Sequence, residues 1–202
     1  GHGWLDLYRA LEISADTYFY DLAYRAGINK IHEYLDYFGF GKSTGIDLSE
    51  ESLGINPSRE WKKKRFNQNW HLGDTVPIGI GQGYWTSTLM QLVKAHTILA
   101  NRGEVKTPHL LKMAIDPVDN TLQNYVQKEE SSSMTIEDKS YFETCKTGMY
   151  LVVNGPEGTG RRAFFGAKYK AAGKSGTAQV VSIKQGEKYD ANKLKVEHRD
   201  NA

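Results

Sequence analysis

The stretch from Lys174 to Val181, KSGTAQVV, constrains the fold most, because it places a charged motif directly before β-forming residues. Valine favours strands, so the stretch predicts a strand that follows a glycine-bearing loop. Alternate side chains of a strand share a face, which puts Lys174 and Gly176 on one side and Ser175 and Thr177 on the other. A glycine at the point of closest approach suits an edge strand that accepts a peptide alongside it. An ordinary turn before a strand is the alternative interpretation.

Length and composition limit the classes of protein that this chain can belong to. With 202 residues it is long enough for one domain, or for one domain and a small part. A net charge of +2 argues against a nucleic-acid partner, because such binding needs clustered positive charge. The dense basic run 62–65 is interpreted as a solvated helix end. The single cysteine, Cys145, excludes an internal disulfide, and no apolar run approaches the roughly 18 residues of a membrane span.

Apolar residues at helical spacing predict five helices. The first two are joined by so short a turn after Gly27 that we expect an antiparallel pair. The stretch 79–85, GIGQGYW, lacks the dinucleotide-binding spacing and is interpreted as a tight turn that plugs the next helix into the core. Cys145 falls on the buried stripe of the last helix and is interpreted as a core residue, not a nucleophile. The helices are expected within 16–26, 29–38, 57–65, 89–103 and 135–152.

The other segments predict little regular structure. Residues 105–113 are expected to form a weak strand, and 116–133 a solvent-exposed insertion. The loop 155–160 half resembles a phosphate-binding loop, but arginines stand where that motif needs Lys and then Ser or Thr, so a mobile loop is preferred. The six histidines lack the spacing of a zinc site, and no metal is expected. The polar segment 186–202 is expected to add no core element.

Two stretches gain meaning when they are considered together. Ser14-x-Asp16 at a predicted helix start and the Lys174 motif match two of the three signatures of the serine acyltransferases that recognise penicillin, S-x-N and K-[ST]-G. The chain resembles the transpeptidase domain of class B penicillin-binding proteins, in the branch that serves cell elongation. The resemblance covers nearly the whole chain and includes residues 14–28, 44–51, 57–66, 73–88, 107–111 and 174–180.

The resemblance implies the α+β fold of penicillin-recognising serine enzymes, the β-lactamase/transpeptidase-like fold, with a helical cluster against an antiparallel sheet. The third signature, S-x-x-K, occurs nowhere in the sequence. In the family its serine is the nucleophile and its lysine the general base. We therefore expect residues 1–202 to be an incomplete transpeptidase domain that begins after this segment and ends before the last strands. The absence of a starting methionine at Gly1 agrees with this expectation.

The resemblance also implies roles for three catalytic residues. Ser14 would help to pass the proton of the nucleophile to the leaving group. Asp16 would hold the lysine of the absent signature and the substrate amide; the family usually has Asn at this position, and this branch is similar in carrying an acid. Lys174 would hold positive potential near Ser14. Without the resemblance, Ser14 and Asp16 could serve as a helix cap and a favourable first-turn charge.

The remaining motif residues are implied to bind the substrate. The hydroxyls of Ser175 and Thr177 would bind the terminal carboxylate of the substrate or of a β-lactam. The backbone N–H of Thr177 would be one of two oxyanion donors, the other belonging to the absent serine. Gly176 would leave room for the acyl group.

The function implied is peptidoglycan D,D-transpeptidation, the cross-linking of stem peptides through a serine acyl-enzyme, with these 202 residues inactive alone. The alternatives are a D,D-carboxypeptidase or β-lactamase-like hydrolase, and a non-catalytic module that binds peptides or partners. The implied partners are D-Ala-D-Ala stem peptides, β-lactams and membrane proteins of the elongation complex. No cofactor is implied. The implied location is the periplasmic face of the bacterial inner membrane.

Overall fold

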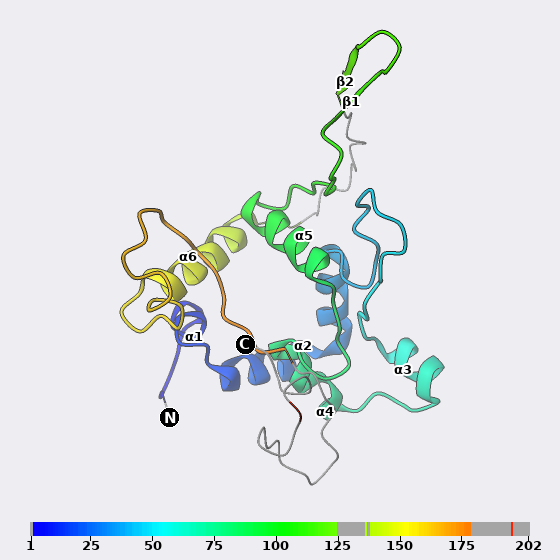
Figure 1. The fold of residues 1–202 in the computed structure, drawn as a ribbon. Coiled ribbons are helices and arrows are strands. Elements are labelled where there is room, and N and C mark those ends of the chain that lie inside the picture. Colours follow the sequence, from blue (N-terminus) through cyan, green and yellow to red (C-terminus); the bar gives the residue numbers. More distant parts are fainter. Residues whose placement is uncertain (1, 125–135, 137, 179–194, 196–202) are drawn as a thin grey trace. The chain divides into compact units, whose positions relative to one another are not determined.

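The computed structural model describes residues 2–124, 136, 138–178 and 195 (Figure 1). The chain forms two compact units: the first comprises Gly1–Ile31, Pro57–Trp85 and Glu143–Ala202, and the second His32–Asn56 and Thr86–Phe142. Helices and a two-stranded antiparallel sheet agree with the predicted α+β class. The helices are α1 (Leu7–Glu12), α2 (Asp16–Tyr37), α3 (Arg59–Phe66), α4 (Leu72–Thr75), the 3₁₀ helix η1 (Val76–Ile80), α5 (Leu89–Ala100) and α6 (Ser140–Asn154), and the strands are β1 (Met113–Ile115) and β2 (Leu122–Asn124).

Helix α2 contains the two helices that were predicted after Ser14, joined across a kink at Gly27. The helical run continues from Asp16 to Tyr37, and only Gly27 departs from helical geometry, with φ 73° and ψ 159°. Glycine adopts this conformation at no steric cost, so the break falls where the sequence places it. The predicted pair of helices and the break at Gly27 are confirmed; the two helices meet at a kink, without the longer turn that was expected between them.

Helix α3 begins and ends on local signals. The side chain of Ser58 accepts a hydrogen bond from the backbone N–H of Trp61 at 3.0 Å, and Asn67 ends the helix with φ 53°. Serine and asparagine are favoured at these two positions. The predicted helix at 57–65 is therefore confirmed within two residues.

The basic run of α3 is not uniformly solvated, because Lys62 is 3% exposed. Its ammonium donates to Asp74 Oδ2 at 2.6 Å and lies 5.9 Å from the Trp70 ring and 5.4 Å from the Tyr84 ring. The Trp61 ring lies 5.4 Å from Tyr84. A buried ammonium is stable only with such partners. The interpretation of 62–65 as a solvated helix end is therefore wrong for Lys62.

The stretch GIGQGYW packs its first glycine against α2. A Cβ atom on Gly79 would lie 2.5 Å from the carbonyl oxygen of Phe19 and 2.7 Å from the Cβ atom of Ala23. Ile78, just before it in η1, is 6% exposed. The predicted tight turn in the core is confirmed, and it is held by close backbone approach.

Helix α6 starts later than predicted. Its first residue is Ser140, whose N–H donates to Asp138 Oδ1 at 2.8 Å; the expected cap Thr135 lies outside the described residues. Phe142 is 3% exposed, and burial raises the pKa of the Cys145 thiol. A raised thiol pKa opposes formation of a thiolate, which agrees with the predicted structural role of Cys145.

In the second unit, the buried residues of α5 are the polar Gln91 and Lys94 and the apolar Ala95 and Ile98. Gln91 is 1% exposed, and its Nε2 donates to the carbonyls of Lys42 at 2.7 Å and Leu53 at 2.8 Å. Lys94 Nζ donates to the carbonyl of Thr44 at 2.9 Å. The loop that contains Lys42 and Thr44 and the loop that contains Leu53 are thereby hydrogen-bonded to one helix. Leu89 and Val93, on another side of the same helix, are exposed.

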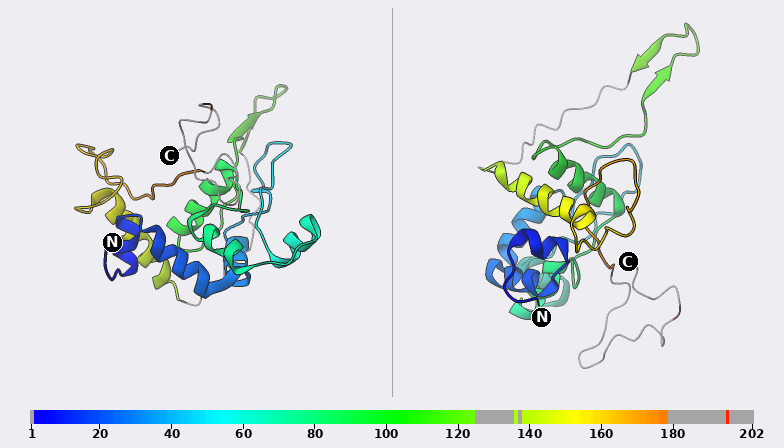
Figure 2. Two further views of the ribbon diagram at one scale, coloured as in Figure 1. Left: turned by 90° about the horizontal axis from the view of Figure 1, so that it is seen from below. Right: turned by 90° about the vertical axis from the view of Figure 1, so that its left-hand side faces the viewer.

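The strand predicted at 105–113 is misplaced. Strand β1 pairs with β2 with Met113 opposite Asn124, and the hairpin extends away from α5 in both views (Figure 2). All six strand residues are exposed. The period-two signal of a strand comes from burial of one face, which this hairpin lacks. In the described part of the predicted insertion, 116–124, exposure is confirmed for every residue except Asp116, which is half-buried.

In its described part, 174–178, the strand predicted at 174–181 is present only as a β bridge at Ala178. Residues 174–177 have no regular secondary structure, and the valines of the motif lie outside the described residues, as does 186–202 except Lys195. Strand geometry requires a paired neighbour, and a motif of four residues does not supply one.

Candidate active site

The turn between α1 and α2 positions Ser14. The N–H of Ser14 donates to the carbonyl of Leu11 at 3.2 Å, and the N–H of Ala15 donates to that of Ala10 at 2.9 Å. These two bonds define a Schellman motif, whose key residue has a left-handed conformation and is usually glycine. Ser14 occupies that position with φ 54°. A non-glycine residue there costs of order 1 kcal/mol, so the serine side chain is retained against a local preference.

Lys174 connects this turn to the KSGT segment. Its Nζ donates to Ser14 Oγ at 2.8 Å, to the Ser175 carbonyl at 2.9 Å and to Ser175 Oγ at 3.1 Å. The three donors of a lysine ammonium are thereby matched by three acceptors. Burial lowers the pKa of Lys174, and the negative charge of Asp16 opposes this shift. The structure thus unites two motifs that are 160 residues apart in sequence.

Thr159 is a member of this cluster that the sequence did not reveal. Its Oγ1 lies 2.9 Å from Ser175 Oγ. Thr159 belongs to the glycine loop after α6, which the sequence indicated only as a failed phosphate-binding loop. A hydroxyl between two glycines was the available signal, and it does not by itself indicate a contact with Ser175.

The other predicted site residues are Asp16, which acts on Lys174 through its charge, and Gly176 and Thr177, which follow Ser175 in the chain. Asp16 is exposed at the first position of α2, and its charge acts on Lys174 and Tyr20. Burial, followed by this charge, raises the pKa of Tyr20. A Cβ atom on Gly176 would meet nothing within 4 Å, and Thr177 is exposed. Open space therefore borders the segment after Ser175.

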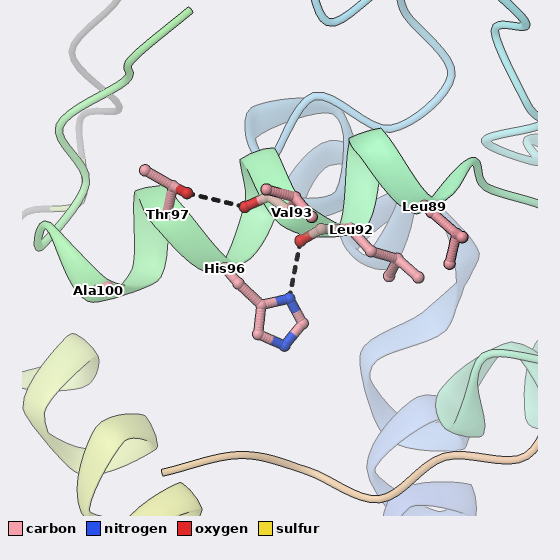
Figure 3. A pocket seen from close by; sticks show the side chains of 6 residues that line it. All are labelled: Leu89, Leu92, Val93, His96, Thr97 and Ala100. Carbon is pink, nitrogen blue, oxygen red and sulfur yellow. Dashed lines mark hydrogen bonds between the residues drawn. The ribbon is translucent and has the colours of Figure 1, made fainter. Parts of the chain in front are cut away.

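A hollow in the second unit, along α5, lacks comparable chemistry (Figure 3). It has a volume of about 610 Å³ and is lined by Leu89, Leu92, Val93, His96, Thr97 and Ala100. His96 Nδ1 lies 2.8 Å from the carbonyl of Leu92, and Thr97 Oγ1 donates to that of Val93 at 2.9 Å. Both polar side chains are thus bonded to their own helix, and the cluster around Lys174 is the better candidate site.

Comparison with known proteins identifies the class of this fold. The chain matches the penicillin binding protein transpeptidase domain over residues 1–197 and belongs to this family. Peptidoglycan D,D-transpeptidase MrdA of Haemophilus influenzae is 48% identical over 202 residues, which are 100% of this chain and 31% of the relative. MrdA of Escherichia coli K12 is 50% identical over 200 residues, 99% of this chain and 31% of the relative. The chain thus spans about a third of the length of these curated relatives.

Solved structures agree with this assignment. Pseudomonas aeruginosa PBP2 in complex with WCK 5153 matches with a TM-score of 0.80 and 41% identity, over 89% of this chain and 40% of that chain. Helicobacter pylori PBP2 in complex with MreC matches with a TM-score of 0.75 and 36% identity, over 89% and 32%. The predicted resemblance to the elongation branch, penicillin-binding protein 2, and the predicted fold are confirmed. In the part of the chain that the structure describes, no helix has the length and apolar character to cross a membrane.

Proposed function

We propose that these 202 residues form one wall of a peptidoglycan D,D-transpeptidase site. The observation that carries the proposal is the 2.8 Å hydrogen bond from Lys174 Nζ to Ser14 Oγ, which joins the two family signatures. The sequence contains no S-x-x-K, so we assign the nucleophilic serine to a segment outside these residues. By this proposal the domain over residues 1–202 is partial and does not react alone.

The proposed reaction has two acyl-transfer steps. The serine of the S-x-x-K segment attacks the carbonyl of the penultimate D-Ala of a stem peptide, an ester bond forms, and the C–N bond to the terminal D-Ala breaks. The serine proton ends on the leaving amine. An amino group of a second stem peptide then attacks the ester, the serine oxygen leaves, and the proton of the amine returns to it.

Ser14 and Lys174 serve as the proton path in this proposal. A lysine ammonium only donates, so Ser14 Oγ accepts from it and the hydroxyl hydrogen of Ser14 is directed elsewhere. That hydrogen is available to the leaving amine. Because burial lowers the pKa of Lys174, its ammonium gives up a proton more readily than an exposed lysine does, which favours relay through Ser14.

The remaining residues bind and orient the substrate. Asp16 holds the S-x-x-K lysine and the substrate amide, and its charge at the start of α2 keeps the site electrostatically balanced against Lys174. The hydroxyls of Ser175 and Thr177 bind the terminal carboxylate, and the N–H of Thr177 is one oxyanion donor. The open space beside Gly176 receives the acyl group.

The family and its relatives support the proposed partners. The family description supports binding of penicillin and other β-lactams. The complex of Helicobacter pylori PBP2 with MreC supports an elongation-complex partner of the same kind for the protein that contains these residues. The acting location that we propose is the periplasmic face of the inner membrane.

Labelled penicillin tests the proposal. The 202-residue chain alone is expected to remain unlabelled, whereas a polypeptide that joins these residues to their S-x-x-K segment becomes covalently labelled. In that longer polypeptide Lys174→Ala should slow labelling at least about 10²-fold, and Lys170→Ala, an exposed lysine nearby, should not. Labelling of the short chain would show that the nucleophile lies within it. With a stem-peptide substrate, cross-linked dimers are expected, and release of D-Ala without dimers would indicate a carboxypeptidase.

A further inference from the structure

The glycine loop 155–160 is held against the end of α1 by Glu12. Glu12 is 4% exposed, and its carboxylate accepts from Arg9 Nη1 at 2.8 Å and from the N–H of Glu157 at 3.0 Å. Its carbonyl accepts from the N–H of Thr159 at 3.2 Å. Burial and the helix dipole both oppose a carboxylate at a helix C-terminus, so these partners are needed to keep it there. The loop is thereby bound to Glu12, which precedes Ser14 by two residues in the sequence.

The loop is also fixed from its other side. The N–H of Gly160 donates to the carbonyl of Val152 at 2.9 Å, and the N–H of Gly158 donates to that of Gly155 at 3.2 Å. A loop with backbone hydrogen bonds on both sides presents its side chains in a defined direction. The earlier interpretation of this segment as a mobile loop does not fit these contacts.

The hydroxyl of Thr159 lies beside Ser175, whose hydroxyl oxygen already accepts one hydrogen bond. Ser175 Oγ accepts from Lys174 Nζ at 3.1 Å, and Thr159 Oγ1 lies 2.9 Å away from it. When Thr159 is the donor, the hydrogen of Ser175 is free to point outward. An anion beside Ser175 favours this arrangement, because each hydroxyl in the chain then donates toward the negative charge.

We propose that Thr159 is a positioning residue that directs the hydroxyl hydrogen of Ser175 toward the carboxylate of the bound peptide or β-lactam. Glu12 contributes by holding the backbone of Thr159 in place. This inference rests on the proposed role of Ser175 in carboxylate binding. It extends that role to a side chain of the glycine loop, which belongs to neither sequence signature.

Acylation kinetics of the longer polypeptide test this proposal. Thr159→Val removes the hydroxyl and keeps the shape, and it should lower the second-order rate constant for penicillin about tenfold. Thr159→Ser keeps the hydroxyl and should remain within about twofold of the wild type. The melting temperature should be unchanged in both variants, because Thr159 is exposed and keeps its backbone bond to Glu12.

A penicillin whose carboxylate is converted to a methyl ester separates positioning from a general structural effect. Thr159→Val should slow the free acid much more than the ester, because only the free acid uses the oriented hydrogen. Equal slowing of both compounds would overturn the inference. Ser175→Ala separates the role of Thr159 from the proposed role of Ser175. If Ser175→Ala slows acylation by the free acid and Thr159→Val does not, only the inference about Thr159 fails. If Ser175→Ala has no effect, the proposed role of Ser175 fails as well.

Discussion

Replacing Ser14 by glycine and by alanine separates the cost of its backbone conformation from the value of its hydroxyl. Both substitutions remove the hydrogen bond from Lys174 Nζ at 2.8 Å. They differ in how well the new residue accepts the left-handed conformation with φ 54°. Glycine adopts this conformation freely, whereas alanine resists it as serine does.

The structure gives the expected magnitudes. Loss of the hydrogen bond costs about 1 kcal/mol in both variants. In Ser14→Gly only, relief of the strain of the left-handed conformation raises the free energy of unfolding by about 1 kcal/mol. Ser14→Gly should therefore be about as stable as the wild type, and Ser14→Ala less stable by about 1 kcal/mol. For a domain of this size, that difference corresponds to about 2–4 °C in melting temperature.

Thermal unfolding followed by circular dichroism measures this difference, and labelled penicillin measures the chemistry in the longer polypeptide. Both variants should lose acylation by about 10²-fold or more, because both lack the proton path. Stability and activity would then diverge in Ser14→Gly, as expected of a residue retained for function at a structural cost. If Ser14→Ala melts at or above the temperature of Ser14→Gly, the argument from backbone strain is refuted.

Three further substitutions test the packing within each of the two units. Lys62→Met should lower the free energy of unfolding by about 3 kcal/mol, because it leaves the carboxylate of Asp74 without its buried partner; a loss below about 1 kcal/mol in urea unfolding would contradict this. Gln91→Leu should cost about 2 kcal/mol in the same assay, since two carbonyls lose their donor. Burial raises the pKa of Glu51, but hydrogen bonds, chiefly from Ser43 and Thr44, outweigh it and lower the pKa overall. Its contribution is present above the unfolded pKa of about 4.3 and is lost as the pH falls through the folded pKa, so the wild type should lose more stability than Glu51→Gln on acidification from about pH 5 to 3. Parallel losses in both proteins would argue against the Glu51 contacts.

Helix boundaries were the most predictable part of the fold, because they depend on residues close in sequence. Ser58 caps α3, and Gly27 breaks α2 where glycine is needed. The apolar stripe of α5 was predicted as a stripe, but which side of the helix is buried was not. That choice depends on Gln91 and Lys94 finding carbonyl partners about 40 to 50 residues away.

The candidate site was likewise predictable from the sequence only in part. Ser14, Asp16 and the Lys174 motif could be named from sequence, because their residue types and order match a known family. The motif did not reveal Thr159, since a hydroxyl in a glycine loop has many possible partners until the loop is placed. Placement depends on the buried carboxylate of Glu12, and an acidic residue at a helix end normally suggests exposure.

The sequence by itself determined the family, the helices and the identity of the two signatures, because these follow from local spacing and from residue type. Only the tertiary structure decided that Lys174 donates to Ser14 and that Ser14 holds a left-handed conformation. It also decided that Thr159 faces Ser175. These features arise where distant segments meet and hydrogen-bonding groups must find partners, and local sequence patterns do not encode such meetings.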